Sequence, residues 1–537
     1  MSYSKPNIKS VAFIFVCLLL NVLCFSQMKD QNIIQYGAVA DGVTNNAGAI
    51  QQAIDRVSAG GGGRVVIPPG NYMTGAIFLK SGVDLHLQLG ATLLGPTTTE
   101  GYLKAKSRPS VVSARDQQNI AISGQGIIDG QAQELMLDIF KKLRTGELKD
   151  DSIWMYKRPG VARANNINFV GCKNVKITGI TLKNSSDWVQ DYRQCDNVVI
   201  DRIKVQSTAY WNNDGLDITD SKNVRITNCF INSSDDAICL KSEDARFLCE
   251  NIYIDSCVVR SSANGFKLGT ASVGGFKNIV VRNLTVYDTY RSAIALESVD
   301  GGILENIDIS GVSATNTGNA IFIRRGHRNV NGKVGTLKGI HIANVKADIP
   351  LLKPDQGYPI EGPPDHLNPG LDKMPRRPSQ YHIYGHPFLP YNLIPSSIVG
   401  LPGYPVEDVL LENIDITYGG KANKNIAFIA PDAITAIPEN KDRYPEFSMW
   451  GELPSWGFYM RHASGIKFNN ISLKYIKDDF RPAFVMDDVR ASMISGLHIP
   501  TAKEMPMIQL NNTKDVQLLK LKLPVVEETA IIKTNYQ

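Results

Sequence analysis

The sequence predicts an all-β fold, a single-stranded right-handed parallel β-helix (a solenoid) with an N-terminal capping helix. The first observation behind this prediction is a strand pattern that recurs every 23 to 28 residues. The second is that short β-branched strands are joined by Asn, Gly and Ser turns. The third is composition, because 537 residues with 20% charged residues and a net charge of +5 suit one large repeat domain. This mild, dispersed charge predicts no nucleic-acid partner.

Residues 1–26 are typical of a secretory signal peptide. Lys5 and Lys9 precede the apolar run VAFIFVCLLLNVLCF, and a small serine ends the segment at a cleavage point. A membrane anchor is the alternative, and lipid attachment at Cys24 is a lesser one because the small residue expected before a lipidated cysteine is missing. We expect export to the periplasm or the extracellular space, no stable membrane insertion, and a β-helix catalytic domain over residues 27–537.

The recurring unit is an Asn or Asp, an aliphatic residue and then alternation, as in NVKITGITL and NIYIDSCVV. A leucine-rich horseshoe would need a helix in each unit, and propeller blades would need longer repeats. A parallel β-helix with one rung per repeat therefore fits best. Six such strands start at Asn174, Asn197, Asn223, Asn251, Asn278 and Asn306.

Two segments do not follow the repeat. The stretch NNAGAIQQAIDRVSAGGGG predicts a helix, because Ile50, Ile54 and Val57 recur at helical spacing. Such a helix would cover the open end of the solenoid, where bare strand edges invite aggregation. Residues 348–405 hold 13 of the chain's 27 prolines, and prolines at this density prevent ladder pairing. We expect an ordered insertion there that projects from the solenoid and walls one end of a groove, which would favour exo cleavage.

Six cysteines follow the signal segment, and none of their spacings suggests a zinc site. We expect most of them to be small buried apolar residues. If a disulfide forms, the expected pair is Cys249–Cys257. The six are Cys172, Cys195, Cys229, Cys239, Cys249 and Cys257.

Five strands that follow the repeat anchors can be stacked: GLDIT, AICLK, GFKLG, AIALE and AIFIR. Alternation gives each strand an inner and an outer face. The inner columns are Leu216, Ile238, Phe266, Ile294 and Ile321, and Ile218, Leu240, Leu268, Leu296 and Ile323. The outer columns are Asp217, Cys239, Lys267, Ala295 and Phe322, and Thr219, Lys241, Gly269, Glu297 and Arg324.

Carboxylates gather at the start of the first two of these strands. Asp214 precedes the first strand, and Asp235 and Asp236 precede the second. Neighbouring rungs are roughly 4.8 Å apart, so the three carboxylates should meet on solvent-facing sheet. Their mutual repulsion should keep one protonated near neutral pH, as acid-plus-base glycoside hydrolysis requires. The alternative is that they only form turns or bind calcium, but the in-register Asp214, with Asp217 beside it, favours chemistry.

Other chemistries have less support. No histidine lies between His86 and His327, so a Ser/His/Asp device on this face is not expected. Calcium-dependent elimination would use acidic metal ligands with a lysine or arginine base. Lys241, Lys267 and Arg324 keep that alternative open.

These residues resemble the motifs of glycoside hydrolase family 28, the polygalacturonase-like enzymes of the pectin-lyase-like β-helix superfamily. The resemblance covers most of the chain after the signal segment, and its motifs include NNDGLD from Asn212, SSDDAICLKS, and LPSWGFYMRHASGIKFNNI. It implies that Asp235 is the general acid and that Asp214 and Asp236 activate water, with inversion at the anomeric carbon. It implies neither a metal nor a cofactor.

Two elements of the family are replaced. Asn264 stands where the family has the histidine of Gly-His-Gly, and ALE, ending at Glu297, replaces the Arg-Ile-Lys that binds the galacturonate carboxylate. An exposed Glu297 would repel a uronate, so we expect it to accept hydrogen bonds from a neutral sugar. A salt bridge with a neighbouring cation is the alternative. Acidic groups of the polymer would then be bound by Lys267, Arg291 or Arg324.

The predicted function is a glycoside hydrolase that cleaves a complex or acidic polysaccharide, pectin-like and branched or otherwise non-standard. The alternatives are a polysaccharide lyase on the same fold and a catalytically inactive carbohydrate-binding β-helix. The expected partner is a polysaccharide or oligosaccharide, and we expect a monomer. Aromatic faces near the carboxylates suit sugar rings, although core packing fits Trp188 equally well. The remaining substrate-binding candidates are Asn212, Asp217, Lys241, Trp188, Tyr210 and Trp211.

Overall fold

The structure, a computed structural model, describes residues 30–102, 108–150, 159–208, 210, 212–329, 332–355, 358, 391–422, 434–500, 507–524 and 530–534. The predicted signal peptide, Trp211 and most of the predicted insertion lie outside these ranges. No helix in the described ranges is long and apolar enough to cross a membrane.

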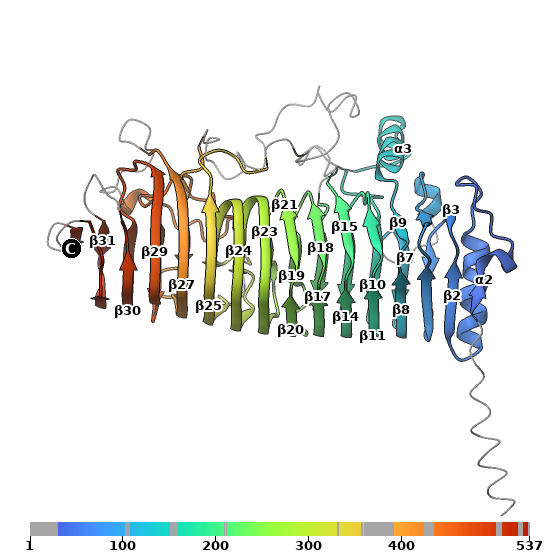
Figure 1. Ribbon diagram of the computed structural model, residues 1–537, viewed down its shortest axis with the longest axis horizontal. Helices are drawn as coiled ribbons and strands as arrows, with labels where there is room; N and C mark the ends of the chain where they lie inside the picture. The colour runs from blue at the N-terminus through green and yellow to red at the C-terminus, as the bar shows by residue number, and fades with distance from the viewer. Residues whose placement is uncertain are drawn as a thin grey trace, which may run out of the picture.

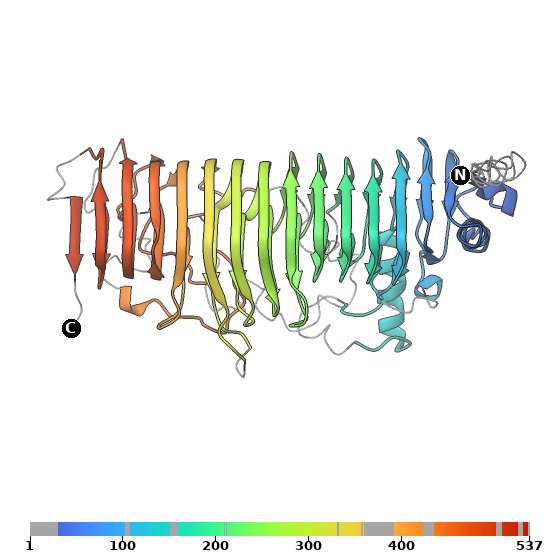
Figure 2. The same cartoon turned by 90° about the horizontal axis from the view of Figure 1, so that it is seen from below.

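The described chain is a solenoid of parallel strands stacked along its long axis, from α2 at one end to β33 at the other (Figures 1 and 2). Strands pair with strands one rung away in three parallel ladders. Parallel crossovers of this kind are right-handed in nearly all cases. The predicted fold class, a right-handed parallel β-helix, is confirmed.

The short strands are grouped here by ladder. The first ladder holds β1 (Gln31–Asn32), β2 (Gly63–Ile67), β5 (Val83–Leu87), β8 (Gln118–Gly124), β11 (Lys173–Thr178), β14 (Asp196–Asp201), β17 (Lys222–Thr227), β20 (Cys249–Asp255) and β32 (Lys514–Leu519). The second holds β3 (Gly70–Met73), β6 (Ala91–Leu94), β9 (Ile127–Asp129), β12 (Thr181–Lys183), β15 (Lys204–Ser207), β18 (Phe230–Ser233) and β21 (Val258–Ser261). The third holds β4 (Ile77–Phe78), β7 (Ser110–Arg115), β10 (Asn165–Val170), β13 (Gln190–Arg193), β16 (Leu216–Thr219), β19 (Ile238–Ser242), β22 (Phe266–Ser272), β26 (Ser396–Val399), β28 (Phe458–Ser464), β31 (Ile508–Asn511) and β33 (Ile531–Thr534).

In the C-terminal half, long strands run through the corners and join more than one ladder. They are β23 (Gly275–Ser298), β24 (Ile303–Arg325), β25 (Thr336–Ile349), β27 (Val406–Gly420), β29 (Lys467–Lys477) and β30 (Phe484–His498). The short 3-10 helices are η1 (Ile33–Tyr36), η2 (Thr99–Tyr102) and η4 (Ile434–Ala436).

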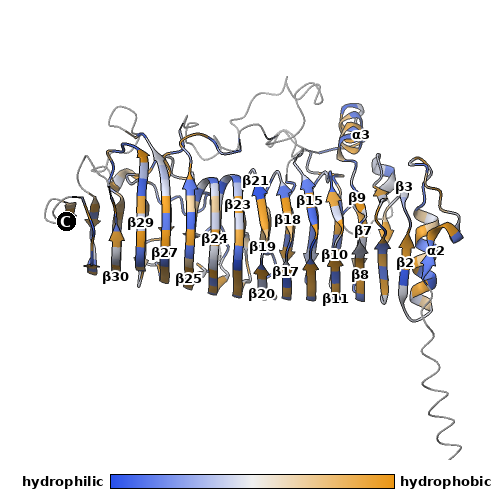
Figure 3. Cartoon of the chain, viewed as in Figure 1, coloured by the Kyte–Doolittle hydropathy of each residue, from blue (hydrophilic) through white to orange (hydrophobic). Residues whose placement is uncertain are grey.

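The core is the inner columns that alternation predicted. Leu216 pairs with Ile238, Ile238 with Phe266, and Phe266 with Ile294, and all four are fully buried. Apolar and polar residues alternate along the strands in Figure 3. Each such side chain contributes roughly 1.5–3 kcal/mol when it leaves water, so the stacked rungs stabilise one another.

The repeated asparagines mark one corner of their rungs. Each adopts a left-handed φ between 55° and 60°, which Asn tolerates better than most residues. Most of their side-chain amides also form a ladder along the solenoid, in which Nδ2 donates to the asparagine Oδ1 of the previous rung, whereas Asn223 Nδ2 donates to Asp196 Oδ1 at 2.7 Å. The bonds run from Asn197 to Asn174 at 2.8 Å, Asn251 to Asn223 at 3.2 Å, Asn278 to Asn251 at 3.1 Å, and Asn306 to Asn278 at 3.1 Å.

Two α-helices accompany the solenoid in the part of the chain that the structure describes. The predicted helix is α2 (Ala47–Ala59), whose buried Ile50, Ile54 and Val57 cover the N-terminal strands. The second, α3 (Ala132–Thr145), lies between β9 and β10 and stands off the strands in Figure 1. The sequence analysis missed α3, although Leu135, Met136 and Ile139 gave it a buried stripe.

The structure departs from the predicted repeat at two places in the C-terminal half. The predicted insertion ends before residue 405, because Ser396–Val399 already forms β26 of the third ladder. A second excursion, not predicted, lies between β27 and β28. Its described residues 434–456, here called the cover segment, pack on the outer face of the third ladder. Phe447, Met449 and Trp450 of this segment share a buried cluster with Ala295 and Phe322.

Candidate functional site

The three aspartates meet at one corner of the solenoid. Asp214 precedes β16, while Asp235 and Asp236 connect β18 to β19 on the next rung. The backbone fixes this approach, because Gly215 N donates to Asp236 O at 2.8 Å. A carboxylate oxygen of Asp214, one of Asp236 and the Cys239 sulfur all lie within 4.8 Å of one another. Asp214 and Asp236 therefore lie together, as the alignment of the rungs predicts.

Their exposure differs from the prediction. Asp214 and Asp236 are only 4% and 3% exposed, whereas Asp235 is half-buried. The outer columns are buried as well, since Asp217, Cys239 and Lys267 have no more than 1% exposure. The predicted solvent-facing row was wrong, because charged neighbours and the cover segment enclose this face.

Lys241 is the cation on the Asp214 side of the site. Its Nζ donates to Asp214 Oδ2 at 2.6 Å and to Asp217 Oδ1. Burial raises the pKa of Asp214 well above its usual range and that of Asp217 to about 7, although the Lys241 ammonium opposes both shifts. Burial, rather than repulsion between carboxylates, is therefore the main cause of both raised pKa values.

Asp236 has the opposite electrostatic environment. Asn264 donates to Asp236 Oδ1 from its backbone N at 3.1 Å and from Nδ2 at 2.7 Å. The Lys267 ammonium lies 3.2 Å from Asp236 Oδ2. Burial alone would raise the pKa of Asp236, but Lys267, other nearby cations and the Asn264 hydrogen bond lower it to about 2. Asn264, in the place of the family's histidine, thus binds a carboxylate of the site.

Glu297 is not the exposed subsite residue that we expected. It is 1% exposed, its Oε2 lies 3.8 Å from Lys267 Nζ, and Thr270 Oγ1 donates to it at 3.1 Å. Burial raises the pKa of Glu297 to about 7, while the Lys267 ammonium opposes the shift. The alternative salt bridge with Lys267 is the contact present, and the partner is not Arg324.

Neither arginine proposed to bind the polymer faces an open surface. Arg324 is buried, and it donates from Nη1 to Gly400 O at 3.0 Å and from Nη2 to Glu439 O at 2.7 Å. Arg291 lies with its Nε 3.3 Å from Glu446 Oε2. Both contacts are to residues distant in sequence, which strand alternation could not reveal.

The aromatic candidates are divided between surface and core. Trp188 is half-buried, with the Lys241 ammonium and the Arg108 guanidinium each 4.2 Å from its ring centroid. Tyr210 is buried, and burial raises its pKa to about 12. Asn212 accepts a hydrogen bond at 3.1 Å from Arg163 Nη2.

Sequence analysis missed several residues around the site. Tyr444 of the cover segment accepts a hydrogen bond from Lys267 at 3.1 Å, and Glu446 pairs with Arg291. Arg163 lies 3.4 Å from Asp187, beside Trp188. Aromatic and charged residues in YPEFSMW were the available signal for the first two.

The cysteines do not pair in the described chain. All six are free and buried, so the expected small apolar role is confirmed and the Cys249–Cys257 disulfide is not formed. Asp214, Asp236 and Cys239 have spacing that suits a metal ion. The Lys241 ammonium, however, lies 3.3 Å from Cys239 Sγ and 2.6 Å from Asp214, so a side-chain cation already contacts these groups.

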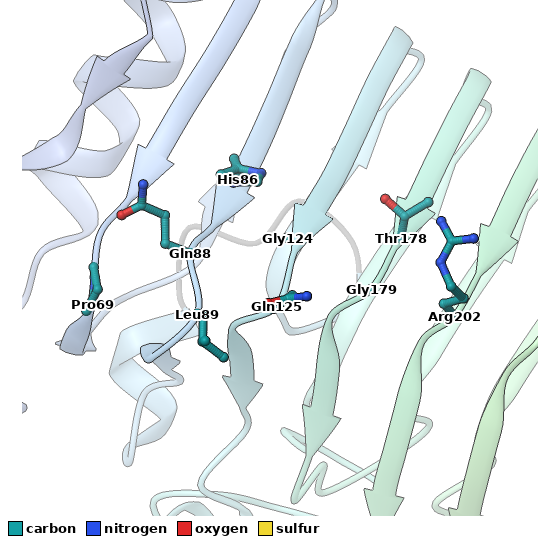
Figure 4. A pocket seen from close by; sticks show the side chains of 9 residues that line it. All are labelled: Pro69, His86, Gln88, Leu89, Gly124, Gln125, Thr178, Gly179 and Arg202. Atoms are coloured by element: carbon teal, nitrogen blue, oxygen red, sulfur yellow. The ribbon is translucent and has the colours of Figure 1, made fainter.

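A pocket of about 610 Å³ lies away from the carboxylates, along the turns between the first and second ladders (Figure 4). His86, Gln125 and Arg202 line it. Its hollow follows from Gly124 and Gly179, whose positive φ and close backbone contacts leave no room for a Cβ. We therefore explain this pocket by turn geometry rather than by chemistry.

The sequence matches a known protein family. The family model for glycosyl hydrolases family 28 matches residues 58–349. The chain belongs to this family. The predicted resemblance to this family is confirmed.

Similar proteins agree with this assignment. An exo-poly-α-D-galacturonosidase of Dickeya chrysanthemi is 27% identical over 319 residues, covering 50% of this chain and 53% of that protein. An endo-xylogalacturonan hydrolase A of Aspergillus tubingensis is 26% identical over 264 residues, covering 48% and 60%. The crystal structure of a hyperthermoactive exopolygalacturonase from Thermotoga maritima is 25% identical with a TM-score of 0.55, covering 73% and 87%. The chain spans about half to three fifths of the length of the first curated relatives.

Proposed function

We propose that the protein is an exported hydrolase of a pectin-like polysaccharide that is branched, acidic or otherwise non-standard, and that it inverts the anomeric carbon. The observation that carries this proposal is the corner where buried Asp214 and Asp236 lie close together and half-buried Asp235 lies next to Asp236 in the same turn. Acid–base hydrolysis needs one carboxyl group that gives a proton and another that takes one. Differences in burial and charge are the physical means of separating those tasks.

Asp235 is proposed as the general acid. It is the half-buried member of the three, whereas Asp214 and Asp236 are buried, so a glycosidic oxygen can reach it from solvent. Among the described residues, no lysine or arginine forms an ion pair with Asp235.

Asp236 is proposed as the general base, with Asp214 helping to hold the water. The pKa of Asp236, lowered to about 2 by Lys267 and its other partners against the effect of burial, keeps this carboxylate ionised at working pH. Asp214 Oδ1 is buried and has no hydrogen-bond partner among the described residues. That acceptor suits a water molecule placed between the two carboxylates.

The substrate proposal follows from the replaced family motif. Glu297 and Ala295 provide no cation where the family binds the galacturonate carboxylate, so unbranched polygalacturonate is a poor candidate. Among the similar proteins, the one from Aspergillus tubingensis is named for xylogalacturonan, a decorated polymer. We therefore propose a decorated pectin as the substrate, and export by the N-terminal segment as the route to it.

The test is a screen of defined polysaccharides: unbranched polygalacturonate, xylogalacturonan, branched pectins and sulfated glycans. New reducing ends support hydrolysis, whereas ultraviolet-absorbing unsaturated products would identify a lyase and reject the proposal. Proton NMR of the first products should show inverted configuration, and retention would reject the inverting assignment. Robust hydrolysis of unbranched polygalacturonate would show that the substrate proposal is wrong. N-terminal sequencing of exported protein tests cleavage after residue 26.

A further inference from the structure

Lys267 lies at the centre of a buried row of charges that crosses three rungs. Its Nζ is 3.2 Å from Asp236 Oδ2 on one side and 3.8 Å from Glu297 Oε2 on the other. These side chains lie on or next to β19, β22 and β23, which stack as consecutive rungs. Lys267 and Glu297 are each 1% exposed, so water does not screen the row.

We infer that Lys267 is a positioning residue for Asp236, and that Glu297 acts on the site through Lys267 rather than by contact with the substrate. This inference rests on the proposed function in one respect, because it takes Asp236 as the general base.

The geometry of the Asp236 carboxylate is the first support. Asn264 holds its Oδ1 from the backbone N and from Nδ2, and the Lys267 ammonium holds its Oδ2. Contacts on both oxygens fix the rotation of the carboxylate about its last bond. A base fixed in this way stays aimed at one water position.

The anchoring of the ammonium is the second support. Glu297 Oε2 holds Lys267 from the following rung and is itself held by Thr270 Oγ1 at 3.1 Å. Tyr444 of the cover segment accepts a hydrogen bond from Lys267 Nζ at 3.1 Å. The ammonium thus lies between two carboxylates, with the Tyr444 hydroxyl as its hydrogen-bond acceptor.

Specificity follows from this arrangement. Because internal partners hold the Lys267 ammonium, it is not free to receive a carboxylate of the polymer. Glu297, which stands in place of the last residue of the family's Arg-Ile-Lys, is therefore one end of an internal row of ion pairs. Any acidic group of the polymer therefore binds elsewhere in the site, away from this row.

Other ionisable groups face the same row, and their charges bear on any pH dependence. On the Asp236 side they are Asp214, Asp217, Asp235, Cys239, Lys241 and Arg291, and on the Glu297 side they are Arg328 and Tyr444. Arg291 is itself paired with Glu446. None of these groups changes in the variants below.

The test compares Lys267→Met, Lys267→Arg, Glu297→Gln and the double variant Lys267→Met/Glu297→Gln. The single Met variant leaves Glu297 as a buried charge without a cation, which threatens folding. The double variant removes both charges and keeps similar volume, so it is the matched control for that risk. Circular dichroism and thermal unfolding establish that each variant is folded.

Two readouts report on Asp236. The first is the pH dependence of kcat and KM on the polysaccharide that the screen identifies. The second is the carboxyl titration of Asp236 by 13C NMR, assigned with Asp236→Asn, which needs no activity. A wild-type protein without hydrolytic activity would overturn the proposed function, whereas the titration still decides whether Lys267 controls Asp236.

Loss of the ammonium should raise the Asp236 titration midpoint by about one unit or more in both Met variants. The acidic limb of kcat should move with it, so that kcat falls about tenfold per unit at low pH while KM stays within about threefold. Lys267→Arg keeps the positive charge, so the acidic limb of its kcat–pH profile should lie close to that of the wild type. Glu297→Gln should not raise the titration midpoint of Asp236. A folded Met variant with an unmoved midpoint would overturn the inference. So would a Glu297→Gln variant in which KM alone rises tenfold, because Glu297 would then contact the substrate.

Discussion

Lys241→Met perturbs a buried ion cluster of the site, next to the row that Lys267 holds. Lys241 Nζ contacts Asp214 at 2.6 Å and also Asp217, and the side chains of these three residues are 10%, 5% and 0% exposed. Methionine keeps the length of the lysine stem but removes the charge. Asp214 and Asp217 are then left without their cation, so breaking the cluster should cost about 3–5 kcal/mol of unfolding free energy at pH 8.

The pH dependence of that loss has a definite sign. Burial raises the pKa of Asp217 to about 7, against Lys241, and an unfolded Asp titrates near 3.9. The folded state therefore binds more protons than the unfolded state between roughly pH 4 and pH 7, so this group lowers stability as pH rises. Without the Lys241 ammonium, the pKa values of Asp214 and Asp217 in the folded state rise further. The difference in unfolding free energy between wild type and variant should thus be small near pH 4 and largest at pH 8.

Urea unfolding at pH 4, 6 and 8 measures this difference. Lys474→Met is the matched control, because Lys474 lies 3.7 Å from Asp415 with both side chains more than 40% exposed. That variant should lose less than about 1 kcal/mol at every pH. Lys241→Met/Asp217→Asn should recover part of the loss at pH 8, since one buried charge is gone. A Lys241→Met loss that is equal at pH 4 and pH 8 would refute the electrostatic explanation.

Three further predictions concern catalysis and the cover segment. Asp235→Asn should lower kcat by about 10²–10⁴-fold while its melting temperature stays near that of wild type, and activity within threefold would remove it from the acid role. Trp450→Ala should cost about 3–5 kcal/mol and expose residues 434–456 to limited proteolysis, because its buried ring packs on the third ladder. Burial opposes the positive charge of His462, but hydrogen bonds to carboxylates including Glu439 raise the pKa of this histidine. The stabilisation that these contacts give is therefore complete below the pKa of His462 in the unfolded state. It is lost as pH rises through the pKa of the folded state. His462→Gln should therefore destabilise more at pH 5.5 than at pH 8.5, and an equal loss at both would contradict this.

The solenoid was predictable because its rules are local and repeat. An asparagine with a positive φ marks one corner in six of the rungs, and a period of two then sends Leu216 and Ile238 inward on consecutive rungs. Once the anchors are aligned, the register follows for every strand between them. The meeting of Asp214 with Asp236 was available from the same alignment, since it depends only on which residues share a corner.

Burial of the outer face was not predictable in that way. Alternation tells which residues point away from the core, but it does not tell what lies beyond them. Lys267 meets Tyr444, and Arg324 meets the backbone of Glu439, across more than 100 residues of sequence. The helix α3 was not predicted for a different reason. Its apolar stripe is present in the sequence, but the prediction followed the strand repeat alone. The roles of the site residues stay predictions.

The two departures from the family at Glu297 and Asn264 have one physical explanation in common. A glutamate with 1% exposure needs a cation and a hydrogen-bond donor, and Lys267 and Thr270 provide them. The same Lys267 ammonium, with the Asn264 amide, holds Asp236 on its two oxygens. A lysine in place of Glu297 would put two ammonium groups together in this buried space and leave Asp236 to compensate both. Glu297→Lys alone should therefore destabilise the protein, and the substitution should be tolerated better when Lys267 is changed as well.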